Sequence, residues 1–312
     1  MSFRTMSRNL LSLAIAASIA SFAVAQTPAP AAPAPAAVMP ATIPTQTPPF
    51  NGIAHIAIRV KDIATSVAFY NKLGFQQAFA NTAADGTVTQ AFIKINDKQF
   101  IELYPVTAHD PDAGFLHLCF EGADLNALHD FYVAEGLAPI AVRKAGAGNL
   151  LFTLKGPEQP AFPQNIEYTQ YMPDSRHSKD AGLHLGPDRV ADKMVRVDLA
   201  MQDFSDALNF YITKLRFPAS KYNAMPDPML LNLPGGSGQQ IRIDRADQLG
   251  TKSSIVLTTP SPDRSAALLT QQKVDFKRIP IKFVNKPSID GPISIIDPDG
   301  NIILVTAAPT QN

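Results

Sequence analysis

Two histidines and two glutamates recur at matching spacings along the chain. Glu102 follows His55 by 47 residues, and Glu167 follows His117 by 50 residues. Imidazole nitrogens and carboxylate oxygens are common ligands of divalent transition metals. The two His–Glu pairs lie in successive copies of one repeated unit. We therefore predict that His55, Glu102, His117 and Glu167 form a single metal site across a pseudo-twofold axis.

Strand periodicity indicates which side chains accompany these four. Alternate residues of a strand share a face. The predicted faces are His55 with Ala57 and Arg59; Phe100 with Glu102 and Tyr104; His117 with Cys119 and Glu121; and Asn165 with Glu167, Thr169 and Tyr171. A cup lined by these faces would hold four ligands and an aromatic wall, for which Phe100, Tyr104 and Tyr171 are candidates, with a place in the core as the alternative.

A metal explains the four residues better than a packed core does. A glutamate buried between apolar neighbours without a partner is costly, and two such glutamates in register with two histidines are hard to place in a core. The ligand set suits one divalent ion, which the sequence leaves open among Ni, Zn, Fe, Mn and Co, with one or two waters completing the shell.

The other histidines lack the repeat register. They are His109, His129, His177 and His184. We expect loop or surface positions for them, although the segment 174–189, which carries two of them, could fold over the cup.

The elements that must position the site occur in four copies. Each copy opens with a strand and continues through an amphipathic helix, which glycine closes in the first two copies, and then through strands that end in a hairpin. The aromatic or apolar helix positions that mark the copies are Phe69, Phe131, Phe210 and Leu268, and the residues 14 positions before them are His55, His117, Arg196 and Ser254. A βαβββ order repeated four times predicts an α+β fold.

The same counting predicts an asymmetry between the two halves. In the C-terminal half the positions of the four ligands are taken by Arg196, Arg242, Ser254 and Leu304. None of these is an ordinary metal ligand, so we predict no metal there. This half could be structural, complete the pocket wall or bind an anion through its two arginines, and we favour the structural role.

The N-terminal residues have the pattern of an export signal. Two arginines precede a short apolar stretch that ends in Ala23-Val24-Ala25, which predicts a signal peptide over 1–25, cleaved before Gln26. An uncleaved anchor helix is the alternative, but the stretch is shorter than the roughly 20 residues that span a bilayer. We therefore expect a periplasmic or secreted protein. The predicted organisation is completed by a Pro/Ala-rich disordered linker (26–49), a metal-binding domain (50–173), a connector (174–189) and a second domain without metal ligands (190–308).

Composition narrows the partners. Acidic and basic residues balance at 27 each, and no basic run indicates a nucleic acid or an anionic membrane surface. We expect a small-molecule substrate, no membrane association after signal cleavage, and a monomer or homodimer. The single Cys119 cannot form an internal disulfide, and its apolar strand favours a buried, inert thiol.

The chain resembles the vicinal oxygen chelate superfamily, which includes glyoxalase I, bleomycin resistance proteins and extradiol dioxygenases. The strand-one histidine, the helix sequence FYNKLGF (69–75) and the closing DPDGNIIL (297–304) carry the resemblance, which covers about residues 50–308. The resemblance implies that the four βαβββ modules pair into two similar domains with curved mixed sheets. By resemblance to glyoxalase, all four ligands bind the metal, and the substrate presents two neighbouring oxygens. The metal would stabilise an enediolate and Glu167 would move the proton, which gives lyase or isomerase chemistry.

The resemblance leaves two further functions open. An extradiol-type dioxygenase would hold Fe(II) with His55, His117 and Glu167 and keep positions for a catechol and oxygen. Glu102 argues against it as a fourth ligand, and so does the place of the ligands, because extradiol enzymes of the superfamily usually carry the metal in the C-terminal pair. A sequestering protein of the bleomycin-resistance type ranks third, because such proteins lack the ligand set.

Overall fold

The computed structural model describes residues 47–48, 50–157, 165–221, 228–246, 252–283 and 286–308. The chain divides after Thr42, and all of these residues belong to the second unit, 43–312. The predicted signal peptide (1–25) lies outside the described residues, as does the predicted linker (26–49) apart from Thr47 and Pro48. Thr47 is buried, and its hydroxyl donates a hydrogen bond to the carbonyl oxygen of Leu215 at 2.9 Å.

The first sheet has eight strands in the order β2-β3-β4-β1-β5-β8-β7-β6. Its strands are β1 (Phe50–Val60), β2 (Gln77–Thr82), β3 (Val88–Asn96), β4 (Gln99–Pro105), β5 (Gly114–Gly122), β6 (Arg143–Lys144), β7 (Leu150–Lys155) and β8 (Asn165–Gln170). β1 pairs antiparallel with β5, while β1–β4 and β5–β8 are parallel. The order therefore reads as two copies of one unit joined back to back.

The second sheet repeats this plan with seven strands in the order β10-β11-β9-β12-β15-β14-β13. Its strands are β9 (Lys193–Met201), β10 (Met229–Asn232), β11 (Gln240–Arg245), β12 (Ser254–Thr259), β13 (Phe276–Phe283), β14 (Lys286–Ile296) and β15 (Ile302–Ala307). β9–β12 is antiparallel, and β9–β11 and β12–β15 are parallel. Within the described residues, the third copy has two named strands after its helix, and an isolated bridge between Ala219 and Leu231 stands where the other copies have a further strand.

One helix follows the opening strand of each copy. The helices are α1 (Ile63–Lys72), α2 (Leu125–Ala134), α4 (Phe204–Leu208), which continues as the π-helical turn η1 (Asn209–Lys214), and α5 (Pro262–Gln271). Each begins at a side chain that caps its first turn; for example, Asp62 accepts from the backbone N–H of Thr65 at 2.6 Å before α1. After α1, Gly74 has φ +83°, and a Cβ there would lie 2.1 Å from the carbonyl oxygen of Asp188, so glycine is required for both the conformation and the contact.

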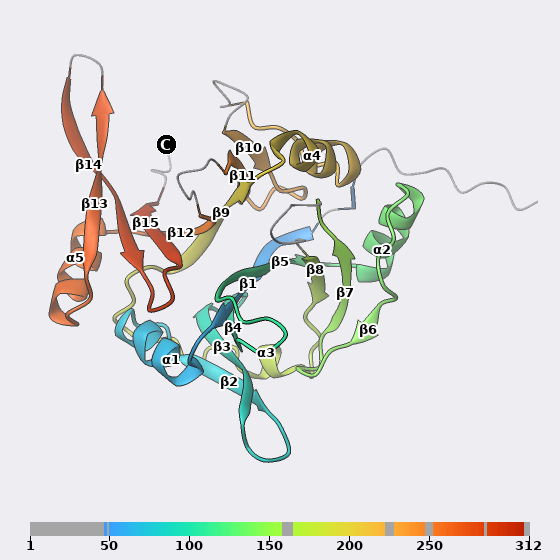
Figure 1. The fold of residues 1–312 in the computed structure, drawn as a ribbon, viewed down its shortest axis with the longest axis horizontal. Coiled ribbons are helices and arrows are strands. Elements are labelled where there is room, and N and C mark those ends of the chain that lie inside the picture. Colours follow the sequence, from blue (N-terminus) through green and yellow to red (C-terminus); the bar gives the residue numbers. More distant parts are fainter. Residues whose placement is uncertain are drawn as a thin grey trace, which may run out of the picture. The chain divides into compact units, whose positions relative to one another are not determined.

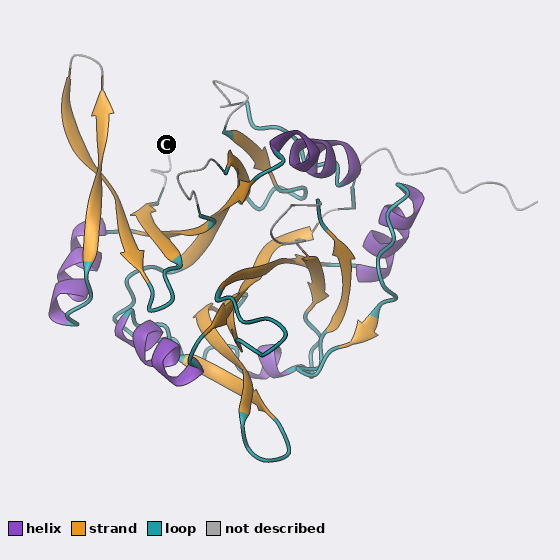
Figure 2. Ribbon diagram, viewed as in Figure 1, coloured by secondary structure: helices purple, strands orange, loops and turns teal. Residues whose placement is uncertain are grey.

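The helices and the predicted ligands lie on opposite faces of the first sheet. On β8, Tyr168 faces α2, because its hydroxyl lies 2.7 Å from that of Tyr132. Glu167 must then point to the other face, since side chains alternate along a strand. Figure 1 shows this sheet curving with α1 and α2 on its outside, and Figure 2 shows strands predominating in both halves. We call the concave face, opposite α1 and α2, the first cup and the corresponding face of the second sheet the second cup.

Two buried glutamines at equivalent places join the halves. The side-chain amide of Gln99, the first residue of β4 in the first copy, bonds both the N–H and the carbonyl oxygen of Met194 at 2.8 and 2.9 Å. Gln239, just before β11 in the third copy, accepts from the N–H of Ile53 at 2.8 Å and donates to the Met194 carbonyl oxygen at 2.7 Å. Each amide therefore substitutes for a strand partner at the end of β1 or β9.

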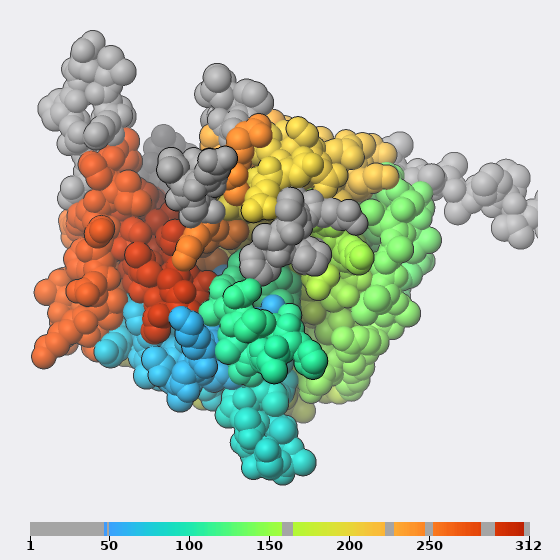
Figure 3. Space-filling model, in the orientation of Figure 1, coloured from blue at the N-terminus to red at the C-terminus, as the bar shows by residue number. Residues whose placement is uncertain are grey.

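The structure confirms the predicted fold class, with two curved mixed sheets and helices outside them. The strands and the four helices named above fall within the predicted ranges 50–173 and 190–308, whose boundaries themselves stay a prediction. The β2–β3 hairpin projects from the surface at the bottom of the view in Figures 1 and 3. No helix in the described part of the chain is long and apolar enough to cross a membrane.

Candidate metal centre

Strand pairing arranges the predicted ligands in two rows across the first cup. In one row, His55 on β1 is the direct partner of Cys119 on β5, and Cys119 is the partner of Glu167 on β8. In the adjacent row, Ala57 separates Glu102 on β4 from His117 on β5. Direct cross-strand partners present their side chains to the same face. The rows therefore bring together the four predicted residues, which we call the His–Glu cluster.

His55 lies at the centre of the His–Glu cluster. Its Nδ1 is 3.3 Å from Glu102 Oε1, and its Nε2 is 3.1 Å from His117 Nε2 and 3.5 Å from Glu167 Oε1. Ligands about 2.0–2.2 Å from one metal at right angles lie about 3 Å apart, so these separations are of the right size. The two nitrogens of His55 face different carboxylates, so the His55 ring or a carboxylate must turn for all four residues to bind one ion.

The two carboxylates are held differently. Glu102 is 6% exposed, and its Oε2 accepts hydrogen bonds from Gln90 Nε2 at 2.6 Å and from the Tyr104 hydroxyl at 3.0 Å. The Glu167 side chain is 15% exposed, and its Oε1 lies 3.5 Å from His55 Nε2. Glu102 is thus fixed by neighbours on β3 and β4, whereas Glu167 lies closer to solvent.

Burial sets the protonation of the cluster. Burial lowers the pKa of His55 well below its usual value, with further lowering by the neighbouring charges of His117 and His177, and burial lowers the pKa of His117 to about 4. Burial also raises the pKa of Glu102, which the Glu167 charge raises further, and burial raises the pKa of Glu167. Without a cation, neutral imidazoles and protonated carboxyls are therefore favoured.

The donor set fits a divalent metal. Two neutral imidazoles offer free nitrogen lone pairs, and the two buried carboxyl groups, one at each nitrogen of His55, are costly to ionise until a cation compensates them. Gln90 and Tyr104 supply the outer hydrogen bonds that usually orient a metal-bound carboxylate. Metal binding itself stays a prediction, but the residues that this chain places together are suited to it.

The connector (174–189) fills one end of the first cup. The sequence had left open that this segment folds over the cup. Its short helix α3 (Arg176–Lys179) begins at Ser175. Just beyond the helix, the Asp180 carboxylate pairs with Lys94 Nζ at 2.8 Å, and Lys94 is completely buried. Arg176 Nη1 donates to Asn81 Oδ1 on β2 at 2.8 Å. The connector is therefore tied to two strands of the first sheet.

The surface or loop position expected for His177 is wrong. His177 is 3% exposed, stacks on Tyr171 with ring centroids 5.0 Å apart, and contacts Phe100 edge-on at 4.7 Å. Its Nδ1 lies 2.9 Å from Asn149 Nδ2, and its Nε2 has no partner. Sequence reasoning missed it because the connector lies outside the repeat; the placement of two histidines in that segment was the one available signal.

The remaining side chains lie as expected. His109 is in an exposed loop, His129 lies part-buried on α2, and His184 is exposed beside Asp180. Of the candidate aromatic wall, Tyr104 lies beside the cluster, with its ring centroid 6.2 Å from that of His117. Phe100 and Tyr171 form the floor around His177.

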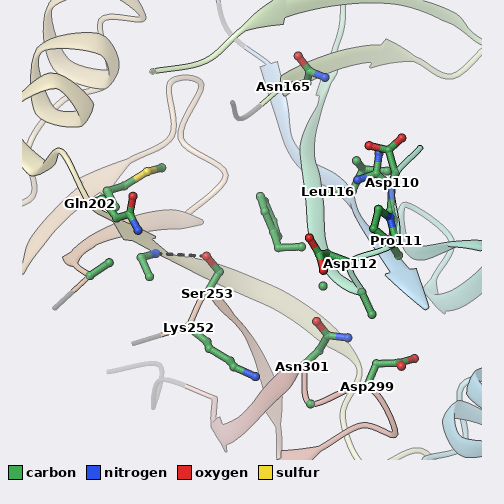
Figure 4. Close-up of a pocket in the computed structure, with 18 of the residues that line it drawn as sticks. Asp110, Pro111, Asp112, Leu116, Asn165, Gln202, Lys252, Ser253, Asp299 and Asn301 are labelled. Carbon is green, nitrogen blue, oxygen red and sulfur yellow. Dashed lines mark hydrogen bonds and ion pairs between the residues drawn. The ribbon is translucent and has the colours of Figure 1, made fainter. Parts of the chain in front are cut away.

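A cavity of about 660 Å³ lies apart from the cluster (Figure 4). None of the four cluster residues lines it. Its lining includes Arg59, Asp110, Asn165, Gln202, Lys252 and Asn301. Arg59 shares the β1 face of His55 but pairs with Asp110 at 3.0 Å. The mixed charges of this cavity do not define a ligand.

The second cup holds an ion-pair network at the position of the cluster. Asp198, 2% exposed, accepts from Arg196 Nη2 at 3.1 Å and from Arg242 Nη2 at 3.2 Å. Arg242 also pairs with Asp244 at 2.8 Å. Ser254 pairs with Ile302 and Val256 with Leu304, so the counted equivalents are in register. The arginines are neutralised internally, which agrees with the structural role favoured from sequence.

Comparison with known proteins gives a family match in the first half. Residues 52–159 match the family model described as Glyoxalase/Bleomycin resistance protein/Dioxygenase superfamily. No curated protein matches the chain in sequence.

Solved structures share the fold across both halves. The Mn(II)-bound glyoxalase from Novosphingobium aromaticivorans has a TM-score of 0.61 at 16% identity, covering 83% of this chain and 82% of that one. The 2,3-dioxygenase LapB from Pseudomonas sp. KL28 has a TM-score of 0.60 at 13% identity, covering 85% and 96%. An extradiol ring-cleaving dioxygenase from B. fuscum has a TM-score of 0.55 at 16% identity, covering 86% and 74%. At these identities the likeness establishes the fold alone.

Proposed function

We propose that the protein is a divalent-metal-dependent lyase or isomerase of the Glyoxalase/Bleomycin resistance protein/Dioxygenase superfamily, whose family model residues 52–159 match. Its substrate would be a small molecule with two neighbouring oxygens. His55, Glu102, His117 and Glu167 would hold the ion, which supplies Lewis-acid polarisation of the substrate oxygens when bound. Its identity is open among Ni, Zn, Fe, Mn and Co.

The observation that carries this proposal is the place of Glu102. It lies in the same compact group as His55 and His117, with donor atoms within 4.8 Å of one another, and two hydrogen bonds fix its orientation. A six-coordinate ion with four protein ligands keeps two positions, which suits a bidentate substrate better than a substrate together with oxygen. Glu102 therefore favours chemistry without oxygen insertion.

Glu167 is the residue best placed to move a proton. Its carboxylate is more exposed than that of Glu102 and lacks the two orienting hydrogen bonds that hold Glu102. Burial raises its pKa toward neutrality, where a carboxylate can both accept and return a proton. We assign Glu167 as the general base that acts at a substrate carbon.

The surroundings would exclude water from this step. Phe100 and His177 close the cup from the connector side, and Tyr104 borders it beside His117. Such walls keep a reactive carbanion-like centre from bulk solvent. The substrate must then enter away from the connector.

An extradiol-type dioxygenase is the second candidate, and a specific observation favours it. The compact group His55, Glu102 and His117 is itself a two-His-one-carboxylate set, the arrangement used by non-haem Fe(II) oxygenases. The carboxylate of this set is Glu102, whereas the dioxygenase ligand set predicted from the sequence contains Glu167. In that function Glu102 would be the indispensable carboxylate and Glu167 dispensable.

A pair of matched substitutions separates the two functions. Proteins loaded with Fe(II), Ni(II), Zn(II) or Mn(II) would be screened with catechols for oxygen uptake, and with 2-oxoaldehyde thiol adducts and α-hydroxy ketones for proton exchange. We expect solvent deuterium to enter a substrate carbon, and Glu167→Gln to reduce that exchange on the order of 10²–10⁴-fold while metal stays bound. Oxygen uptake by the Fe(II) form alone, unchanged in Glu167→Gln and lost in Glu102→Gln, would establish the dioxygenase instead.

The proposal includes export from the cytoplasm. It is supported by the charged and apolar pattern of residues 1–25 and the small residues before Gln26. Expression in a bacterial host followed by N-terminal sequencing of the periplasmic fraction should give a chain that begins at Gln26. An intact N-terminus in the cytoplasmic fraction would count against export.

A further inference from the structure

The single thiol of the chain lies inside the row that links two of the cluster residues. Cys119 on β5 is the direct strand partner of His55 on β1 and of Glu167 on β8. Three side chains in direct register on neighbouring strands share one face and lie close together. Cys119 therefore lies between an imidazole and a carboxylate.

The contacts agree with this register. The Cys119 Sγ, a nitrogen of His55 and a carboxylate oxygen of Glu167 lie within 4.8 Å of one another. Cys119 is completely buried, and its thiol donates to the carbonyl oxygen of Phe120 at 3.7 Å. His55 is 3% exposed. The sulfur is thus held among donors of two other kinds, and the three form a compact set from three strands.

The internal repeat supplies a comparison for this position. Ala57 lies two residues after His55, and Cys119 lies two residues after His117, so the two are repeat equivalents. Ala57 separates Glu102 from His117 in the other row. An alanine is therefore sufficient for packing at this place, and the sulfur adds a donor to one row of the cluster.

We propose that Cys119 is a sulfur ligand, which with His55 and Glu167 makes the first cup a site for thiophilic divalent cations such as Zn(II), Co(II) or Cd(II). The inference rests on the proposed metal site: for such a cation Cys119 would take the place of Glu102, so that four protein ligands still leave two positions. Thiolate sulfur favours such soft or borderline cations, whereas Mn(II) and Mg(II) favour oxygen. A nearby cation also offsets the cost of a buried thiolate, which burial and the carboxylate charges otherwise disfavour.

Cobalt substitution gives a direct readout, because a thiolate bound to Co(II) produces an intense near-ultraviolet charge-transfer absorption. The full chain would be loaded with Co(II) alone. Since the chain has one cysteine, any such band comes from Cys119. We expect the band in the wild type and its loss in Cys119→Ala, with Co(II) still bound through the other residues. Thermal unfolding of the variant checks that it folds, and Ala57 shows that alanine fits an equivalent place.

The effects of Cys119→Ala on the affinities for Cd(II) and Mn(II) distinguish a metal ligand from a residue that only packs against the site. We expect Cys119→Ala to weaken Cd(II) binding by at least about tenfold and to leave Mn(II) binding within about threefold. Equal losses for both cations would mean that Cys119 only shapes the site. Bound Co(II) without the band in the wild type would overturn the sulfur ligand and leave the proposed metal site intact. No bound Co(II), Cd(II) or Mn(II) in the wild type would overturn both.

Discussion

The first and second cups carry different side chains at equivalent strand positions. In the first, Glu102 and Glu167 face the two ring nitrogens of His55, and burial raises the pKa of both carboxyls. In the second, Arg196 and Arg242 occupy the places of His55 and Glu102, and both pair with the buried carboxylate of Asp198. One sheet plan thus supports either a site suited to an external cation or a network that contains its own cations. The difference indicates that metal binding depends on a few positions and not on the fold.

Replacing a histidine of the first cup should have the largest effect. His55→Ala or His117→Ala should lower divalent-metal affinity by more than about 100-fold, beyond the 10–100-fold typical of outer-shell changes. Arg196→Ala and Arg242→Ala are the matched controls and should retain the wild-type stoichiometry of one ion per chain. Isothermal titration and elemental analysis would measure both, and metal loss from an arginine variant would remove the distinction between the cups.

Removing the outer hydrogen bonds of Glu102 should have a smaller effect. Tyr104→Phe and Gln90→Leu each delete one donor to Glu102 Oε2 and should weaken metal binding by about 10–100-fold. The control is Gln240→Leu, which removes a part-buried amide that donates to Asn232 in the second half and should leave affinity unchanged. Equal weakening by all three would indicate a general loss of stability.

Metal affinity should rise with pH. The raised pKa values of Glu102 and Glu167 leave these carboxyls partly protonated near neutrality, and metal binding must release those protons. The lowered pKa values of His55 and His117 make both imidazoles neutral there, so they release none. We expect up to about a tenfold gain per pH unit for each proton released, flattening above the carboxyl pKa values. Titrations in buffers of different ionisation enthalpy would count the protons, and an affinity flat with pH would contradict this charge state.

Breaking the second network should mainly affect stability. Arg196→Ala leaves the buried Asp198 paired with Arg242. It should lower the free energy of unfolding by about 1 kcal/mol, since the arginines are partly exposed. Denaturant unfolding with and without metal would measure it. If Arg196→Ala lowered the free energy of unfolding only in the metal-loaded protein, the second cup would be coupled to the metal site. That result would contradict the comparison of the two cups.

Much of the fold was predictable because the repeat fixes both the order and the faces of the strands. Counting 14 residues back from the helix aromatics identified His55 and His117, and the ladder confirms Arg242 as the counterpart of Glu102. The reduced third copy was not predictable, since nothing in the pattern distinguishes a strand from the single Ala219–Leu231 bridge.

The parts of the site that escaped prediction depend on contacts distant in sequence. His177 reaches the floor of the cup from the connector, where no periodicity applies. Asp198 was not recognised as the centre of the second network, because pairing with two arginines follows from side-chain geometry. The face of Cys119 was predicted by alternation, but its position between His55 and Glu167 required the strand register.

Anomalous scattering from crystals soaked in Mn(II) tests the contrast between the cups most directly. We predict one strong peak in the first cup, about 2.0–2.3 Å from donor atoms of His55, Glu102, His117 and Glu167. One side chain of the cluster would be turned relative to the present structure. We predict no peak beside Asp198. An empty first cup, or a peak of equal strength within the arginine network, would contradict it.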